Sequence, residues 1–130
     1  AVCVVMVESN EEDFEFDTTT GTIIGYKGSG GTVVIPMTIN DVAVEHIGYC
    51  AFVRFDYDIY DYISNNISSL ILPSGLLDLD YGAFAYSMDL ESIFISDSVI
   101  NIESDAFQGC SKLREINVDK ANSRVWMECY

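Results

Sequence analysis

The stretch LESIFISDSVINIESDAFQGCSK, residues 90–112, decides the fold because the residues just before it follow the same pattern. Residues 67–89 read ISSLILPSGLLDLDYGAFAYSMD, and their apolar positions match the later copy at an offset of 23 (90 − 67). The matched pairs are Ile67 with Leu90, Leu70 with Ile93, Leu72 with Ile95, Leu76 with Val99, Leu79 with Ile102, and Ala83-Phe84 with Ala106-Phe107. Self-similarity at a period of about 20–50 residues is the sequence signature of a repeat protein.

Each unit begins with apolar residues that alternate with one other residue, as Ile93 and Ile95 do on either side of Phe94. Alternation at period two predicts a short strand with one buried face. One strand of this length cannot bury that face, but a stack of equivalent strands can. Phe84 and Phe107 are expected to act as wedges between units. The pattern therefore predicts a mostly-β repeat solenoid whose strands form a parallel sheet.

The unit L-x-x-I-x-I-x-x-x-V-x-x-I-x-x-x-A-F-x-G-C-x-x-L, from Leu90 to Leu113, resembles the BspA-type leucine-rich repeat. The earlier copy departs from it, with Tyr86-Ser87-Met88 where Gly-Cys-Ser would stand. The resemblance implies a short right-handed leucine-rich-repeat stack from a family found mostly in bacterial surface proteins and in some parasitic protists. It also implies a non-enzymatic protein-binding or adhesion module, secreted or displayed on a cell surface.

A length of 130 residues predicts a single domain, and the repeat spacing divides this domain into five segments. The last of these segments fits either a C-terminal cap or a cut from a longer array of repeats. The expected divisions are an N-terminal strand and hairpin cap at 1–31, a first repeat with an insertion at 32–66, repeats at 67–89 and 90–112, and a partial repeat or cap at 113–130.

The segment before the first repeat reads as hairpin-like strands, at 14–16, 22–26 and 32–35, and also resembles the segment that commonly precedes BspA-type repeats. Lys27–Gly31 is predicted to be a hairpin turn between the last two of these strands. It is not a phosphate loop, because it lacks a Gly-Lys-Ser/Thr ending and a strand follows where a helix is required. The opening AVCVVMV is too short to span a membrane and reads as a first strand or a leader remnant.

An insertion interrupts the repeats after Phe52. Phe52 to Ile67 is 15 steps (67 − 52), whereas Phe84 to Leu90 is 6 (90 − 84), so nine residues are added. Insertions in repeats map to loops on one face, often the binding face. Packing of the aromatic rings over the edge of the sheet is the alternative. The aromatic residues concerned, which we take as candidate partner-binding residues, are Phe55, Tyr57, Tyr60 and Tyr62.

The same insertion carries Asp56, Asp58 and Asp61, a spacing that suggests calcium. A calcium loop of the EF-hand kind needs Gly at its sixth position and Glu at its twelfth. Counted from Asp56, these positions hold Asp61 and Ile67, so the motif fails and we expect no metal.

A row of side chains is expected to point outward from the parallel sheet, between the buried positions of successive strands. Three of them are apolar and would form an exposed patch of the kind that marks interaction sites. Coverage of this patch by the C-terminal tail or another chain is the alternative. The row is Val34, Ile71, Phe94 and Asn117, with Thr32, Ser69, Ser92 and Glu115 beside it.

The charge balance of the chain limits the classes of partner that it can bind. Six Lys and Arg against 21 Asp and Glu give a net charge of −15, which disfavours nucleic acid and anionic membranes. His46 is the only histidine and no Cys-x-x-Cys pair exists, so we expect no enzyme, zinc site or cofactor. Cys110 is expected to be a small buried residue. The partner is expected to be a protein, with a host extracellular or surface protein implied by the resemblance. A spacer, stalk or self-assembling surface element without a ligand is the alternative function.

Overall fold

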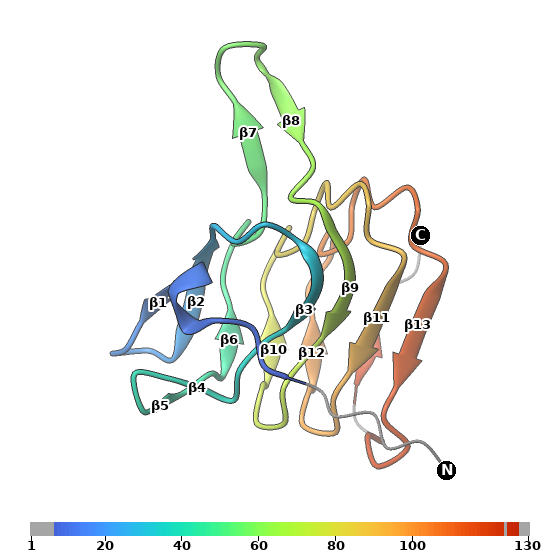
Figure 1. Cartoon of the computed structure of the whole chain (residues 1–130). Helices are drawn as coiled ribbons and strands as arrows, with labels where there is room; N and C mark the ends of the chain where they lie inside the picture. The colour runs from blue at the N-terminus through green and yellow to red at the C-terminus, as the bar shows by residue number, and fades with distance from the viewer. Residues whose placement is uncertain (1–6, 124, 128–130) are drawn as a thin grey trace.

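The computed structural model describes residues 7–123 and 125–127, and two layered sheets dominate it (Figure 1). The four-stranded sheet has the order β13-β11-β9-β3 and consists of β3 (Gly31–Val34), β9 (Ile67–Ile71), β11 (Ser92–Ile95) and β13 (Glu115–Val118). The six-stranded sheet has the order β1-β2-β6-β10-β12-β14 and consists of β1 (Phe14–Asp17), β2 (Thr22–Tyr26), β6 (His46–Ile47), β10 (Asp78–Leu79), β12 (Asn101–Ile102) and β14 (Trp126–Met127).

Smaller elements lie at the margins of these sheets. Two antiparallel hairpins pair β4 (Thr38–Ile39) with β5 (Val42–Ala43) and β7 (Arg54–Asp56) with β8 (Asp61–Ile63). The one helical element among the described residues is the three-residue 3₁₀ turn η1 (Glu11–Asp13). No helix in that part of the chain has the length and apolar character to cross a bilayer.

The 23-residue offset appears directly as strand register. In the four-stranded sheet all pairs are parallel, and Ile93 of β11 lies opposite Leu70 of β9 and Ile116 of β13. The predictions of a mostly-β repeat fold and of a parallel sheet are confirmed. Each unit also contributes a two-residue strand to the second sheet, where Leu79 lies between Ile47 and Ile102. Strands this short carry too little alternation to be recognised in the sequence.

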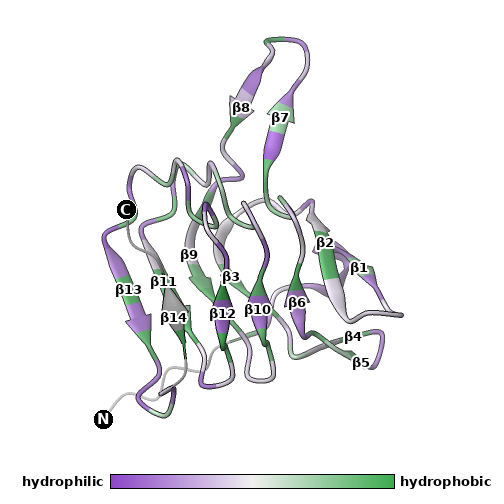
Figure 2. Cartoon of the chain, turned by 180° about the vertical axis from the view of Figure 1, so that it is seen from behind, coloured by the Kyte–Doolittle hydropathy of each residue, from purple (hydrophilic) through white to green (hydrophobic). Residues whose placement is uncertain are grey.

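The core lies between the two sheets. Leu70, Ile93, Ile47 and Leu79 face it and are at most 1% exposed. Figure 2 shows that β6, β10 and β12 each combine a hydrophilic residue with a hydrophobic one, and the hydrophobic residues Ile47, Leu79 and Ile102 are buried. Burial of one such aliphatic side chain stabilises the fold by about 1.5–3 kcal/mol.

Aromatic rings continue the core along the stack. The ring centroids of Phe52 and Phe84 are 4.5 Å apart, and those of Phe84 and Phe107 are 5.9 Å apart. Phe84 is fully buried, as its expected role as a wedge requires, whereas Phe107 is only half-buried against the cluster. Tyr26 extends the ladder at the N-terminal end, with its ring stacked 5.1 Å from that of Phe52.

In the N-terminal segment, β1 and β2 pair antiparallel as a hairpin. The prediction that Lys27–Gly31 forms a hairpin turn is wrong, because β2 and β3 belong to different sheets. This segment instead crosses from one layer to the other. The crossover follows from packing, since Val33 of β3 reaches the core only if β3 pairs with β9 in the opposite sheet.

The crossover depends on close backbone contacts. The N–H of Gly30 donates to the Tyr26 hydroxyl at 2.9 Å, and the N–H of Gly31 donates to the Asn66 carbonyl at 2.8 Å. Gly30 has a φ of +89°, and a Cβ there would lie 2.3 Å from the Asn66 carbonyl oxygen. Glycine is therefore needed at position 30, because the backbone there has a positive φ and lies too close to Asn66 for any side chain.

The free edge of β3 is covered by the N-terminal segment. The N–H of Ser9 donates to the Val34 carbonyl at 2.8 Å, and the Val34 N–H donates to Ser9 Oγ at 2.9 Å. Coverage of an edge strand in this way removes a template for unwanted pairing. Of the expected first strand or leader remnant at residues 1–7, residues 1–6 lie outside the described residues, and Val7 is exposed and in no strand.

Gly30→Ala should destabilise the protein more than Gly31→Ala. Gly31 also has a positive φ, of +75°, but a Cβ there meets no atom within 4 Å. Gly31→Ala therefore adds backbone strain of about 1–3 kcal/mol, whereas Gly30→Ala adds a backbone clash to similar strain. Urea denaturation followed by circular dichroism measures both losses. Equal losses would show that the approach of Gly30 to Asn66 is unimportant.

Candidate functional site

The nine-residue insertion forms the β7–β8 hairpin, which projects from the body in both views (Figures 1 and 2). Near its tip, Tyr57, Ile59 and Tyr60 are 80%, 65% and 79% exposed. The interpretation that all these rings pack over the edge of the sheet is therefore wrong for Tyr57 and Tyr60. The nine extra residues thus form a hairpin that leaves the body of the protein.

Phe55 organises the hairpin. Its ring lies edge-on to the rings of Tyr57, Tyr60 and Tyr62, with centroid distances of 4.9, 5.4 and 5.1 Å. Edge-on aromatic pairs contribute about 0.5–1.5 kcal/mol each beyond the area that they bury. The hairpin thus has a small aromatic cluster of its own.

The carboxylates of the insertion shape its turn. Asp56 Oδ1 accepts from the N–H groups of Asp58 and Ile59 at 2.8 and 3.4 Å, and Asp61 Oδ1 accepts from the Tyr62 N–H at 2.8 Å. These bonds explain the Asp spacing as turn chemistry. Within residues 7–123 and 125–127, no group of three His, Cys, Asp or Glu side chains is placed to hold a metal ion.

The base of the hairpin is held by a tyrosine stack. The rings of Tyr62 and Tyr86 lie 3.9 Å apart between centroids and are nearly parallel, at 10°. Tyr86 has a φ of +58° and occupies the place in its unit that Gly109 fills in the next (109 − 86 = 23). A left-handed backbone is a genuine outlier for a bulky residue and costs about 1–3 kcal/mol. The departure from Gly-Cys-Ser at this point therefore places an aromatic ring under the hairpin.

Gly109 of the following unit packs directly against the Tyr86 ring. A Cβ at Gly109 would lie 2.5 Å from Cδ1 of Tyr86, so the missing side chain makes room for the ring. The N–H of Tyr86 also donates to the Gln108 carbonyl at 2.6 Å. Tyr86 is thus held between the hairpin and the following unit.

A hollow of about 220 Å³ opens beside this stack and extends over three successive units. We call it the tyrosine hollow, because four tyrosines, Tyr49, Tyr62, Tyr81 and Tyr86, line it. Small residues leave room between the rings, since a Cβ at Gly82 would lie 3.0 Å from the Cys50 sulfur. The remaining lining residues are Cys50, Val53, Gly82, Ala85, Asp105 and Gln108.

The electrostatics of the hollow are acidic. The Glu103 charge and its hydrogen bond to the phenol raise the pKa of Tyr81, and Asp80 adds to this effect. The pKa of Tyr49 is raised chiefly by the neighbouring Cys50 thiol, with smaller contributions that include Asp80. Asp80 also accepts the Tyr81 N–H at 2.7 Å. The hollow therefore combines exposed ring faces with nearby carboxylates.

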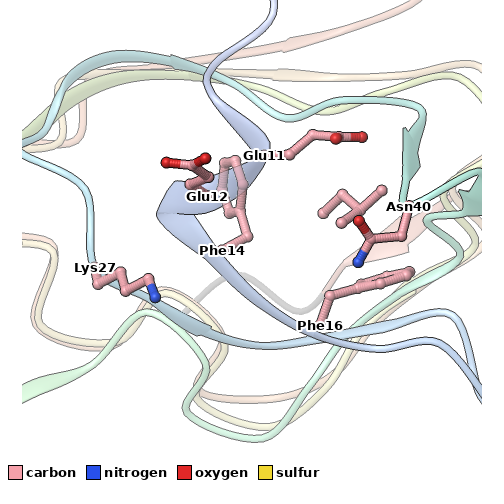
Figure 3. Close-up of a pocket in the computed structure, with 7 residues that line it drawn as sticks. Glu11, Glu12, Phe14, Phe16, Lys27 and Asn40 are labelled. Atoms are coloured by element: carbon pink, nitrogen blue, oxygen red, sulfur yellow. The ribbon is translucent and has the colours of Figure 1, made fainter.

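A second hollow, of about 470 Å³, lies at the N-terminal end of the stack (Figure 3). Its apolar lining comes from Phe14, Phe16 and Ile39, and its polar lining from Glu11, Glu12, Lys27 and Asn40. Figure 3 shows Lys27 on the side of the hollow opposite Asn40. The mixed charges of this lining favour no one class of ligand.

The residues of the predicted outward row lie in register, but its three apolar members are half-buried and do not form the fully exposed patch that the sequence predicts. Val34, Ile71, Phe94 and Asn117 lie opposite one another on successive strands. The row beside it also aligns, with Ser92 Oγ donating to Ser69 Oγ at 3.1 Å. A binding role for either row stays a prediction.

His46 has a carboxylate partner that the sequence spacing does not reveal. Its Nδ1 lies 2.9 Å from Asp78 Oδ2, across neighbouring strands of the six-stranded sheet. The pair is about one-third exposed, with 35% and 34% of the two side chains accessible. It lies outside both hollows, since neither residue is part of either lining.

Of the four tyrosines that line the hollow, the candidate partner-binding residues predicted from the sequence include Tyr62 and omit Tyr49, Tyr81 and Tyr86. One signal was available, because Tyr49 and Tyr81 each stand two residues before an Ala-Phe pair, 32 residues apart (81 − 49). That distance equals one repeat period plus the nine-residue insertion. The glycine position occupied by Tyr86 was the second signal.

Parallel strands that recur every 23 residues and are closed by an Ala-Phe pair are the architecture of a leucine-rich repeat protein. The sequence matches the family described as "BspA type Leucine rich repeat region (6 copies)" over residues 32–130. The chain therefore belongs to the BspA-type leucine-rich repeat family. A search of curated proteins found no match.

Two solved structures are similar. A leucine rich repeat protein of T. pallidum has a TM-score of 0.70 and 24% identity, over 85% of this chain and 49% of that one. A leucine rich cell surface protein of Faecalibacterium prausnitzii has a TM-score of 0.46 and 22% identity, over 82% of this chain and 30% of that one. The chain thus spans half or less of each, and the first likeness supports the fold alone.

Tyr62 and Tyr86 should be energetically coupled. In a double-mutant cycle of Tyr62→Ala with Tyr86→Gly, we expect a coupling energy of about 0.5–1.5 kcal/mol from loss of the stacked pair. Denaturant unfolding of the four proteins measures it. The matched cycle replaces Tyr62→Ala with Tyr57→Ala, whose ring contacts Phe55, and should show no coupling to Tyr86. Similar values in the two cycles would mean that the stack does not hold the hairpin.

Cys110 should react slowly in the folded protein. Its thiol donates to the Phe84 carbonyl at 3.2 Å, and burial raises the pKa of this thiol to about 11. Relative to an unperturbed pKa of 9.0, the thiolate fraction at pH 8 falls roughly 90-fold. The rate of alkylation of Cys110 by iodoacetamide is measured by peptide mass spectrometry. For the folded protein this rate should be low at pH 8 and increase with pH up to about pH 11, and in urea it should be high at pH 8. Equal rates with and without urea at pH 8 would contradict the expected burial.

Proposed function

We propose that this chain is a non-enzymatic protein-binding module of a secreted or surface-displayed protein, and that it contacts its partner mainly through the β7–β8 hairpin. The observation that carries the proposal is the exposure of Tyr57, Ile59 and Tyr60, at 80%, 65% and 79%, near the tip of a projecting hairpin. A repeat insertion with exposed aromatic rings is a typical position for binding.

The construction of the hairpin supports this role. Tyrosine offers a large contact area at low cost in side-chain entropy, and tyrosines are enriched among residues that dominate binding energy. The Phe55 cluster and the stack of Tyr62 on Tyr86 hold the hairpin before any partner arrives. Such preorganisation reduces the entropy lost on association.

The charge supports a partner with a basic surface. The net charge of −15 and the carboxylates of Asp56, Asp58 and Asp61 attract cationic proteins and increase their rate of encounter. We propose adhesion to a host extracellular or surface protein, on the basis of the family to which the chain belongs. The outward row Val34, Ile71, Phe94 and Asn117 is a second candidate contact surface.

The same proposal extends to the architecture. We propose that the units form a right-handed solenoid and that the β1–β2 hairpin serves as its N-terminal cap. In support, β2 pairs in parallel with β6 at the end of the six-stranded sheet, and β1 occupies the outer edge. A repeat stack needs such a terminal element to cover its last apolar layer.

A structural spacer or self-assembling element is the second candidate, favoured by one observation. Ile116 and Val118 of β13 are 40% and 39% exposed, although they match the buried Ile93 and Ile95 of β11. An apolar strand face of this kind would suit another repeat or another copy of the chain.

Deletion of residues 55–63 should abolish partner binding while leaving the fold intact. The deletion removes nine residues and leaves six steps from Phe52 to Ile67, as from Phe84 to Leu90. The test is capture from a panel of purified extracellular-matrix and plasma proteins, at low and high salt. Cooperative thermal unfolding of the variant serves as the folding control.

Two further variants separate the surfaces. Tyr57→Ser with Tyr60→Ser should lose the captured protein, whereas Ile71→Asp with Phe94→Asp should retain it. Capture that survives loss of the tyrosines and fails in the second variant would move the binding site to the outward row. No capture by the unmodified chain would favour the spacer function.

A further inference from the structure

The tyrosine hollow is a candidate site for a cationic group because of what its walls offer. Ring faces carry negative charge and attract cations that lie within about 6 Å of the ring centroid. Tyr49 and Tyr81 are 72% and 49% exposed, so their faces are accessible to a ligand. Asp105 lines the hollow, and the charge of Glu103 raises the pKa of Tyr81, which also lines it.

Among residues 7–123 and 125–127, no basic side chain lines the hollow. Three of the basic side chains that the structure describes have partners elsewhere, since Arg54 donates to the Gly28 carbonyl, Lys112 contacts Asp89 and Arg114 contacts Glu91. Lys27 lines the other hollow. The negative charge around the tyrosines is therefore available to a partner.

The chain already contains one example of the contact in question. The guanidinium carbon of Arg54 lies 5.4 Å from the centroid of the Tyr26 ring. A guanidinium is planar, so it can stack flat on a ring face and donate from its edge to a carboxylate in a bidentate arrangement. An ammonium has neither the flat face nor the paired donors. The arrangement of ring faces beside Asp105 and Glu103 suits both halves of that contact.

The volume of the tyrosine hollow and the backbone strain of Tyr86 also favour a binding site for a side chain. A volume of about 220 Å³ is below the range of about 300–1,000 Å³ typical of sites for whole small molecules, and suits one long side chain. Tyr86 keeps a strained backbone at a position where the next unit has Gly109, and its ring forms one wall. Such strain persists where the surroundings over-determine it, often at binding sites.

We infer that the tyrosine hollow binds an arginine side chain of a protein partner, held between the tyrosine rings and the carboxylates of Asp105 and Glu103. This inference rests on the proposed function, since it assigns a specific anchor on the partner to a position at the base of the hairpin. The guanidinium would stack on Tyr81 or Tyr49, and the aliphatic part of the side chain would lie over Gly82 and Ala85.

The test uses a probe that needs no protein partner. The peptide acetyl-Gly-Arg-Gly-amide is titrated into the full chain with labelled tyrosines, and ring signals are followed by NMR. We expect saturable shifts of Tyr49, Tyr81 and Tyr86, with the citrulline analogue, which is neutral, giving none. A lysine peptide should bind several-fold more weakly. Equal binding by citrulline or by lysine would overturn the assignment to arginine.

Variants locate the site. Tyr81→Leu should weaken the peptide about fivefold, as expected for loss of one cation–ring contact. Asp105→Asn should also weaken it, whereas Asp58→Asn removes the same charge from the exposed hairpin turn and should have no effect. Equal weakening by the two Asp→Asn variants would indicate diffuse attraction to an acidic surface and overturn the site.

The experiments distinguish failure of the arginine site from failure of the proposed binding function of the hairpin. Tyr57→Ser with Tyr60→Ser should abolish capture of a protein partner and leave the arginine peptide bound. If the peptide saturates the hollow while the unmodified chain captures no protein, the hollow stands and the proposed function falls. If the chain captures a protein through its hairpin while the peptide does not bind, the arginine site falls and the proposed function stands.

Discussion

Stacking of aromatic rings along the repeat axis is the interaction on which the rest of the structure depends. The centroids of Phe52 and Phe84 are 4.5 Å apart, close to the spacing of about 4.8 Å between neighbouring strands. Each unit therefore places its Phe one strand further along. Because each unit must bury its strand face against its neighbours, the period of 23 residues is held between units that carry no insertion.

That constraint explains where the chain is free to vary. Nine extra residues cannot enter the stack without displacing Ile67 from its place, so they leave it as the β7–β8 hairpin. Asn65 closes the gap beneath them, with Nδ2 donating to the Phe52 carbonyl and to Ser87 Oγ at 3.0 and 2.8 Å. The body keeps its core while the insertion presents tyrosines to solvent.

Two departures from the repeat meet at one place. The insertion supplies Tyr62, and Tyr86 stands where the repeat has glycine, and their rings stack at 3.9 Å. The tyrosine hollow lies beside this contact and includes residues of three units. Surface features that interrupt a repeat are free of its packing rules, which is why function is expected there. The acidic balance of the chain then favours partners that carry positive charge.

The sequence by itself determined the repeat period, the buried positions of the inner units and the parallel register of the longer strands, because burial of an alternating face dictates all three. It also predicted the insertion, the outward row from Val34 to Asn117 and the β1–β2 hairpin. Tertiary structure alone decided that Lys27–Gly31 crosses between layers, that two-residue strands form a second sheet, and that His46 meets Asp78. It alone brought Tyr49, Tyr62, Tyr81 and Tyr86 around one hollow. Such contacts join residues of different units, and their geometry depends on how the units stack, which no single stretch of sequence encodes.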